Sequence, residues 1–114
     1  TATVERDSFL KSVKRVALLS NDVSRQIKFA FNNEQTIVST VDADHGTEAE
    51  ERLAIEYHGE PLEIGFNARY LMENLHALES DNIIMKFTTP DSAAVIRPAD
   101  DENVLMLLMP VRLS

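Results

Sequence analysis

Residues 9–19 repeat apolar side chains at the spacing of an amphipathic α-helix. The apolar positions that share one face are Phe9, Val13, Val16 and Ala17. Just before them, Asp7 and Ser8 are residue types that favour the N-cap of a helix. The pattern therefore predicts a helix with one buried face over residues 9–19.

A second helical pattern occupies residues 68–78 and follows Asn67, another residue type that favours the N-cap. Its apolar face contains Leu71, Leu75 and Leu78. Polar side chains, among them Arg69, Glu73 and His76, fall on the other side. The chain is thus predicted to carry two amphipathic helices.

The remaining apolar residues mostly alternate with polar ones, which is the pattern of half-buried strands. Asn32, Asn33 and Glu34 form a tight turn between two such segments, so these two are predicted to pair as a hairpin. Residues 47–57 are assigned to one long strand, although their acidic residues locally look helical. The predicted strands are residues 1–5, 24–31, 36–41, 47–57, 62–66, 82–87, 92–97 and 103–109.

These elements predict an α+β domain in which two helices pack on eight mostly antiparallel strands, in the order β-α-β-β-β-β-α-β-β-β. The 114 residues fit a single domain and can bury a real core. The longest apolar run is too short to span a bilayer, and the N-terminal residues do not resemble a signal peptide.

The C-terminal ten residues are unusually apolar, because seven of them are Leu, Met or Val. The end of a domain is normally polar and frayed unless it is tied down. Pro110 within this segment cannot donate a hydrogen bond to a central strand ladder. We therefore expect a buried strand that ends in a binding surface.

The net charge of −8 argues against a protein whose whole surface binds nucleic acid. The first helix nevertheless gathers Lys11, Lys14 and Arg15 on the face opposite its apolar residues. The alternative interpretation of these cations is an ordinary solvated helix face. Leu18 lies in the middle of this basic face and Leu19 beside it, so both are candidates for contact with another domain or chain. The alternative is that the last turn of the helix packs into the core of its own domain or is a 3₁₀ turn.

The sequence contains no recognisable catalytic motif. The three histidines, His45, His58 and His76, lack metal-ligand spacing, and there is no Gly-x-Ser-x-Gly elbow or glycine-rich phosphate loop. Cysteine is absent, which excludes disulfides and thiolate metal sites. The acidic residues around 42–51 and 100–102 are typical of solvated loops rather than of a calcium or magnesium site. We therefore predict a protein that is not an enzyme and needs no cofactor or metal.

Four segments resemble the third, C-terminal domain of the bacterial DNA polymerase III β subunit, the sliding clamp family. They are residues 17–21, 64–71, 96–98 and 108–113, and they follow the family's order over nearly the whole chain. The segments Ile-Gly-Phe-Asn-x-x-Tyr-Leu and Met-Pro-x-Arg-Leu carry most of the specificity.

The resemblance implies a processivity factor of DNA replication. In the family, three such domains form a chain, and two chains close into a ring whose helices surround duplex DNA. The ring tethers the DNA polymerase III catalytic subunit, the clamp loader and repair proteins in the bacterial cytoplasm, associated with the nucleoid. It is not catalytic, and its contact with DNA does not depend on base sequence.

The resemblance also implies site residues. Leu18 and Leu19 would meet the partner subunit, and the cations facing DNA would be Lys11, Lys14, Arg15 and Arg69. The groove that receives a short linear peptide would be lined by Asn67, Tyr70, Ser92, Ala93, Leu107, Met109, Pro110, Val111 and Arg112. Leu107 is chosen over Leu108 because neighbouring residues of a strand point to opposite sides.

The chain departs from the family in two respects. The first two domains are not in this sequence, so we expect residues 1–114 to be one domain excised from a three-domain chain, with an incomplete groove. Val111 also stands where the family often has a bulkier Met. An alternative function is an independent module that uses the same fold only for self-assembly. A hydrolase built on His58 or His76 has no supporting motif.

Overall fold

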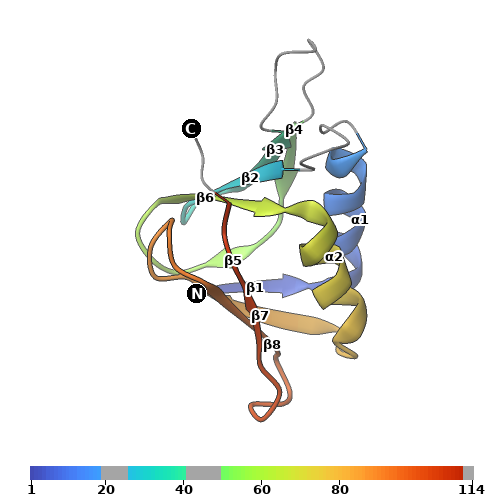
Figure 1. Ribbon diagram of the computed structural model, residues 1–114. Coiled ribbons are helices and arrows are strands. Elements are labelled where there is room, and N and C mark those ends of the chain that lie inside the picture. The colour runs from blue at the N-terminus through green and yellow to red at the C-terminus, as the bar shows by residue number, and fades with distance from the viewer. Residues whose placement is uncertain (19–25, 41–49, 112–114) are drawn as a thin grey trace.

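The computed structural model describes residues 1–18, 26–40 and 50–111. Within them the chain forms two helices and nine short strands (Figure 1). In chain order these are β1 (Ala2–Glu5), α1 (Arg6–Ala17), β2 (Gln26–Phe31), β3 (Thr36–Thr40), β4 (Glu50–Leu53), β5 (Glu56–Tyr57), β6 (Leu62–Asn67), α2 (Ala68–Ala77), β7 (Asn82–Lys86), β8 (Ala94–Pro98) and β9 (Met106–Leu108). Neither helix is long and apolar enough to cross a membrane.

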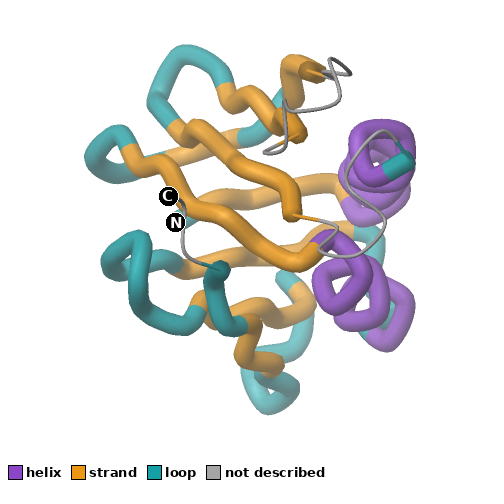
Figure 2. Tube along the Cα trace, turned by 45° about the horizontal axis from the view of Figure 1, so that its top comes forward, coloured by secondary structure: helices purple, strands orange, loops and turns teal. Residues whose placement is uncertain are grey.

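The strands form two antiparallel sheets. One has the order β5-β1-β7-β8-β9 and the other the order β4-β3-β2-β6. The two helices lie side by side along one flank of the sheets (Figure 2). The predicted α+β architecture of two helices on mostly antiparallel strands is therefore correct, and the predicted hairpin is the β2–β3 pair.

The topology is an internal repeat that the sequence does not display. The order β1-α1-β2-β3-β4 is followed, after the short β5, by the same order in β6-α2-β7-β8-β9. The halves exchange their first strands, because β1 pairs with β7 and β6 pairs with β2. Each helix also contacts the last strand of its own half, α1 with β4 and α2 with β9.

The core lies between the helices and the sheets. All seven apolar residues assigned to the two helix faces are buried, from Phe9 on α1 to Leu78 after α2. The rings of Phe9 and Phe31 lie on either side of Phe29, with centroid distances of 5.6 and 5.5 Å. Offset aromatic packing of this kind adds to the free energy gained from burying the apolar area.

The predicted N-cap residue is correct for α2 and wrong for α1. Asn67 caps α2, and its side-chain oxygen accepts hydrogen bonds from the backbone N–H groups of Arg69 at 2.9 Å and Tyr70 at 3.3 Å. The predicted capping of the first helix by Asp7 or Ser8 is wrong. That helix begins at Arg6, and Glu5 occupies its N-cap position without a side-chain cap bond.

The long strand predicted over residues 47–57 is also corrected. Its described part consists of β4 and β5, which belong to different sheets. Between them the chain makes a tight turn, in which the N–H of Ile55 donates to the carbonyl of Leu53 at 3.1 Å. Leu53 is paired with Thr36 on β3, whereas Tyr57 is paired with Ala2 on β1. The two ends of the segment therefore belong to different sheets, and one continuous strand cannot form.

Candidate functional site

A surface groove of about 330 Å³ lies between the start of α2 and the strand β9. Three large apolar side chains at this groove are mostly exposed, namely Tyr70 at 59%, Leu107 at 68% and Met109 at 66%. Exposed apolar side chains gathered in one place are typical of a surface that binds another molecule. The remaining lining residues are Glu73, Asn74 and Leu108.

Local folding explains why these side chains point outward. The Asn67 cap fixes the first turn of α2, where Ala68 and Leu71 are buried and Tyr70 therefore faces solvent. On β9 the alternation of the strand exposes Leu107 and buries Leu108, which is only 4% exposed. Asn67 itself does not line the groove. It positions Tyr70 by accepting a hydrogen bond from the backbone N–H of that residue.

The C-terminal segment crosses from one sheet to the other directly after the groove. The N–H of Val111 donates to the carbonyl of Gly65 on β6 at 2.8 Å, whereas β9 belongs to the other sheet. Pro110 and Val111 then line a second, adjoining depression with Pro90 and Asp91. This hydrogen bond ties the tail down and fixes the orientation of the segment that carries Met109.

The structure brings together only part of the predicted peptide site. The groove beside α2 contains three of the predicted residues, Tyr70, Leu107 and Met109. The adjoining depression contains two more, Pro110 and Val111. Ser92 and Ala93 precede β8 rather than lying on it, so their predicted placement on that strand is wrong. Ser92 closes a turn instead, with its Oγ 2.7 Å from Oγ1 of Thr89. These two residues line neither depression, and Arg112 lies outside the described residues.

Sequence reasoning missed five lining residues. One of them is Leu108, which the alternation of the strand assigned to the core and which lines the floor of the groove although it is only 4% exposed. Glu73 and Asn74 stand three and four positions after Tyr70, and helical periodicity alone would have placed them on the same face. Pro90 and Asp91 had no comparable signal, because they meet the tail only through the pairing of distant strands.

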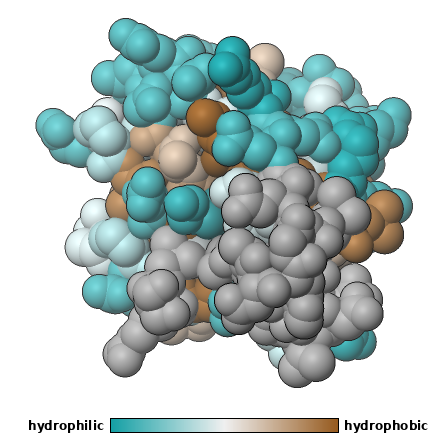
Figure 3. Space-filling model, turned by 90° about the horizontal axis from the view of Figure 1, so that it is seen from above, coloured by the Kyte–Doolittle hydropathy of each residue, from teal (hydrophilic) through white to brown (hydrophobic). Residues whose placement is uncertain are grey.

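A second surface of interest is the exposed face of α1. Lys11, Lys14, Arg15 and Leu18 all lie on it and are exposed, with Leu18 at 78%. Leu18 therefore does not curl into the core, while Leu19 lies outside the described residues. Hydrophilic side chains cover most of the described surface seen in Figure 3, and the apolar ones form small groups.

Arg15 is held by a carboxylate from the neighbouring strand β4. Its Nε and one terminal nitrogen each lie 2.8 Å from an oxygen of Glu51, and the same terminal nitrogen donates to the hydroxyl of Ser12 at 3.1 Å. The hydrogen bond from Arg15 lowers the pKa of Glu51, and the same bond raises the pKa of Arg15. The two-bond geometry links α1 to β4.

The other predicted DNA-facing cations are less constrained. Arg69 lies 3.5 Å from Glu73, one turn further along α2, and both side chains are well exposed. Lys11 and Lys14 form no ion pair within the described ranges. Residues 1–18, 26–40 and 50–111 contain no cluster of three His, Asp or Glu side chains placed to hold a metal ion.

Comparison with known proteins identifies a family. Residues 1–112 match the family described as the C-terminal domain of the DNA polymerase III beta subunit. The beta sliding clamp of Caulobacter vibrioides is 34% identical over 110 residues, which is 96% of this chain and 29% of that protein. The beta sliding clamp of Vibrio cholerae is 31% identical over 103 residues, or 90% of this chain and 28% of that protein.

Solved structures agree. A sliding clamp from Bartonella birtlesii is 38% identical and superimposes with a TM-score of 0.90, covering 97% of this chain and 32% of that chain. A sliding clamp from Pseudomonas aeruginosa bound to griselimycin is 29% identical with a TM-score of 0.93, covering 98% of this chain and 30% of that chain. The chain thus spans less than a third of the length of the curated relatives that it matches.

Proposed function

The chain belongs to the family of C-terminal domains of the DNA polymerase III beta subunit, and on that premise we propose that it is one domain of a ring-shaped sliding clamp. The ring encircles duplex DNA and tethers replication and repair proteins to it. The domain performs no chemistry, so its contribution is binding alone. It acts in the cytoplasm on the DNA of the nucleoid.

The observation that carries this proposal is the groove between α2 and β9. An adaptable apolar surface of Tyr70, Leu107 and Met109 suits the apolar side chains of a short linear peptide. Among the described strands β9 pairs only with β8, so its other edge leaves backbone groups that an extended peptide can meet. The partners are the polymerase catalytic subunit, the clamp loader and other proteins that carry a clamp-binding motif.

The charge distribution suits a ring that slides. Lys11 and Lys14 extend from an otherwise acidic domain, so they attract phosphate without reading bases. The net charge of −8 keeps the rest of the surface from adhering to DNA. The helices therefore line the inside of the ring, and the sheets lie outside.

In this proposal residues 1–114 are one of three domains of a longer chain, and two such chains close the ring. Leu18 at the end of α1, together with Leu19, contacts the first domain of the partner subunit. An independent self-assembling module would also use the exposed Leu18, but it would leave the groove and the cations of α1 without a role.

A peptide titration tests the groove. We expect a fluorescein-labelled peptide containing Gln-Leu-x-Leu-Phe to bind the full-length protein, and the Tyr70→Ala/Leu107→Ala variant to bind it at least about tenfold more weakly, as is usual for central apolar contacts. Fluorescence polarisation measures both affinities. Leu105→Ala is the matched control, because Leu105 is 61% exposed but lies outside the groove.

Equal affinity in the double variant and in the Leu105→Ala control would contradict the assignment. So would unchanged binding after removal of residues 109–114, since these supply Met109 and the tail that is anchored to β6. Because the domain contributes only part of the full groove, we expect the isolated 114-residue chain to bind the peptide more weakly than the whole clamp.

A further inference from the structure

Met109 is by far the most exposed of the four methionines in the chain. It is 66% exposed, whereas Met85 on β7 is 2% exposed. Met72 on α2 and Met106 on β9 are partly buried and pack against the core. An oxidant has to reach the sulfur of a methionine before it can react, so exposure favours Met109 over the other three.

The backbone on both sides of Met109 is anchored. Leu108, directly before it, is buried and is paired with Ala94 on β8. Two positions after it, the N–H of Val111 donates to the carbonyl of Gly65 at 2.8 Å. These contacts keep Met109 in the groove between α2 and β9, called the α2 groove below. A chemical change at its sulfur therefore takes place within the proposed peptide site.

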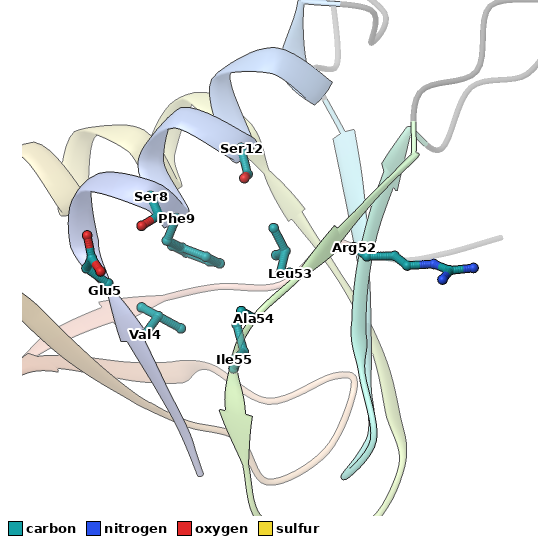
Figure 4. A pocket seen from close by; sticks show the side chains of 9 residues that line it. All are labelled: Val4, Glu5, Ser8, Phe9, Ser12, Arg52, Leu53, Ala54 and Ile55. Atoms are coloured by element: carbon teal, nitrogen blue, oxygen red, sulfur yellow. The ribbon is translucent and has the colours of Figure 1, made fainter.

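The groove between α1 and the segment that leaves β4 offers a contrast (Figure 4). It has a volume of about 290 Å³, and Phe9 points across it toward Leu53. Ser8 and Ser12 add two hydroxyl groups on the helix side, and the described lining residues include no methionine. Hydroxyl and hydrocarbon groups lack the easily oxidised sulfur of a thioether. A mild oxidant therefore alters the α2 groove and leaves this one unchanged.

Oxidation of a thioether by hydrogen peroxide changes its polarity. The sulfur lone pair forms a bond to one peroxide oxygen, the O–O bond breaks, and the products are the sulfoxide and water. The new sulfoxide oxygen accepts hydrogen bonds. In the empty groove it can accept them from water, from the hydroxyl of Tyr70 or from the side-chain amide of Asn74. An apolar peptide side chain displaces the water and offers no donor, so binding then carries a desolvation cost.

We propose that Met109 is an oxidative modification site, at which a peroxide converts the α2 groove into a form that binds linear peptides weakly. The change is reversible, because methionine sulfoxide reductases return the sulfoxide to the thioether. The loss of peptide binding rests on the proposed function of the α2 groove. The preferential oxidation of Met109 rests only on its exposure.

Mass spectrometry of digested protein tests the modification itself. The full-length protein is treated with limiting hydrogen peroxide, and the sulfoxide content of each methionine is followed over time. We expect Met109 to be oxidised before Met72, Met85 and Met106. Bound Gln-Leu-x-Leu-Phe peptide should slow the oxidation of Met109 and leave that of Met106 unchanged. Oxidation of Met85 as fast as that of Met109 would overturn the proposal.

Fluorescence polarisation with the labelled Gln-Leu-x-Leu-Phe peptide tests the effect on binding. We expect peroxide to weaken binding to the full-length protein about tenfold, the cost of leaving one polar group unpaired. Methionine sulfoxide reductases of both stereospecificities should restore it. Met109→Leu removes the sulfur, so peroxide should not change its affinity relative to its own untreated sample. Met106→Leu is the matched control on the same strand and should respond to peroxide like the unmodified protein.

Two results would contradict the assigned effect. One is an unchanged affinity after complete conversion of Met109 to the sulfoxide. The other is an equal loss of affinity in Met109→Leu, because a different residue would then be responsible. If the untreated full-length protein failed to bind the peptide, the proposed function would be wrong, and Met109 would be a modification site that controls no peptide binding.

Discussion

Lys14 and Arg15 are neighbours on the exposed face of α1. Of the two, Arg15 alone forms an ion pair within the described residues, with the carboxylate of Glu51. Its two 2.8 Å contacts with Glu51 and its bond to Ser12 direct the guanidinium toward β4. A cation engaged in this way must break short hydrogen bonds before it can meet a phosphate. We therefore expect Arg15 to contribute to the packing of α1 against β4 more than to DNA contact, and Lys11 and Lys14 to carry the proposed attraction to phosphate.

The salt dependence of DNA binding separates these roles. We expect Lys14→Gln in the full-length protein to reduce the slope of log K against log salt by about 0.9, the value for one phosphate contact. Arg15→Gln should reduce it by clearly less. Electrophoretic or anisotropy titrations with duplex DNA at several salt concentrations measure the slopes. Equal reductions in the two variants would show that Arg15 leaves Glu51 and binds phosphate.

At the scale of elements, the two proposed binding surfaces lie at the end of α1 and at the start of α2. Leu18 follows the last helical residue of α1 and is 78% exposed, so its side chain contributes little to the core. We expect Leu18→Ala with Leu19→Ala to weaken subunit association in the full-length protein at least about tenfold, without lowering the thermal stability of this domain. Sedimentation velocity over a concentration series measures the association.

Leu107→Ala is the matched control for that experiment, because Leu107 is similarly exposed but belongs to the α2 groove. It should leave sedimentation unchanged. If the leucine pair sedimented like the unmodified protein, the contact between subunits would have to lie elsewhere.

The periodicity of apolar residues predicts the features that depend only on residues close together in the sequence. The buried faces of both helices and the Asn67 cap depend on residues within a few positions of one another, and the structure has them as expected. The break between β4 and β5 was not predictable in this way, since Leu53 pairs with Thr36 and Tyr57 with Ala2. The same holds for Arg15 and Glu51, which are 36 residues apart.

The site was predictable to a similar extent. Tyr70, Leu107 and Met109 came from a resemblance in sequence, and strand alternation chose Leu107 over Leu108. Ser92 and Ala93 were misplaced because the turn closed by Thr89 delays the start of β8.

At the scale of the whole molecule, the domain consists of two halves with the same order of elements, and each half ends in a strand, β4 or β9, at the edge of its sheet. Within residues 1–18, 26–40 and 50–111, one edge of β4 and one edge of β9 pair with no other strand. Unpaired strand edges favour aggregation of an isolated chain. In a ring built from three such domains per chain, neighbouring domains and bound peptides would cover these surfaces.

The central claim is that the groove between α2 and β9 receives a linear peptide. A crystal structure of the full-length protein with a bound Gln-Leu-x-Leu-Phe peptide tests it most directly. We expect the apolar side chains of the peptide to contact Tyr70, Leu107 and Met109. A peptide bound elsewhere on the protein, with this groove empty, would contradict the claim.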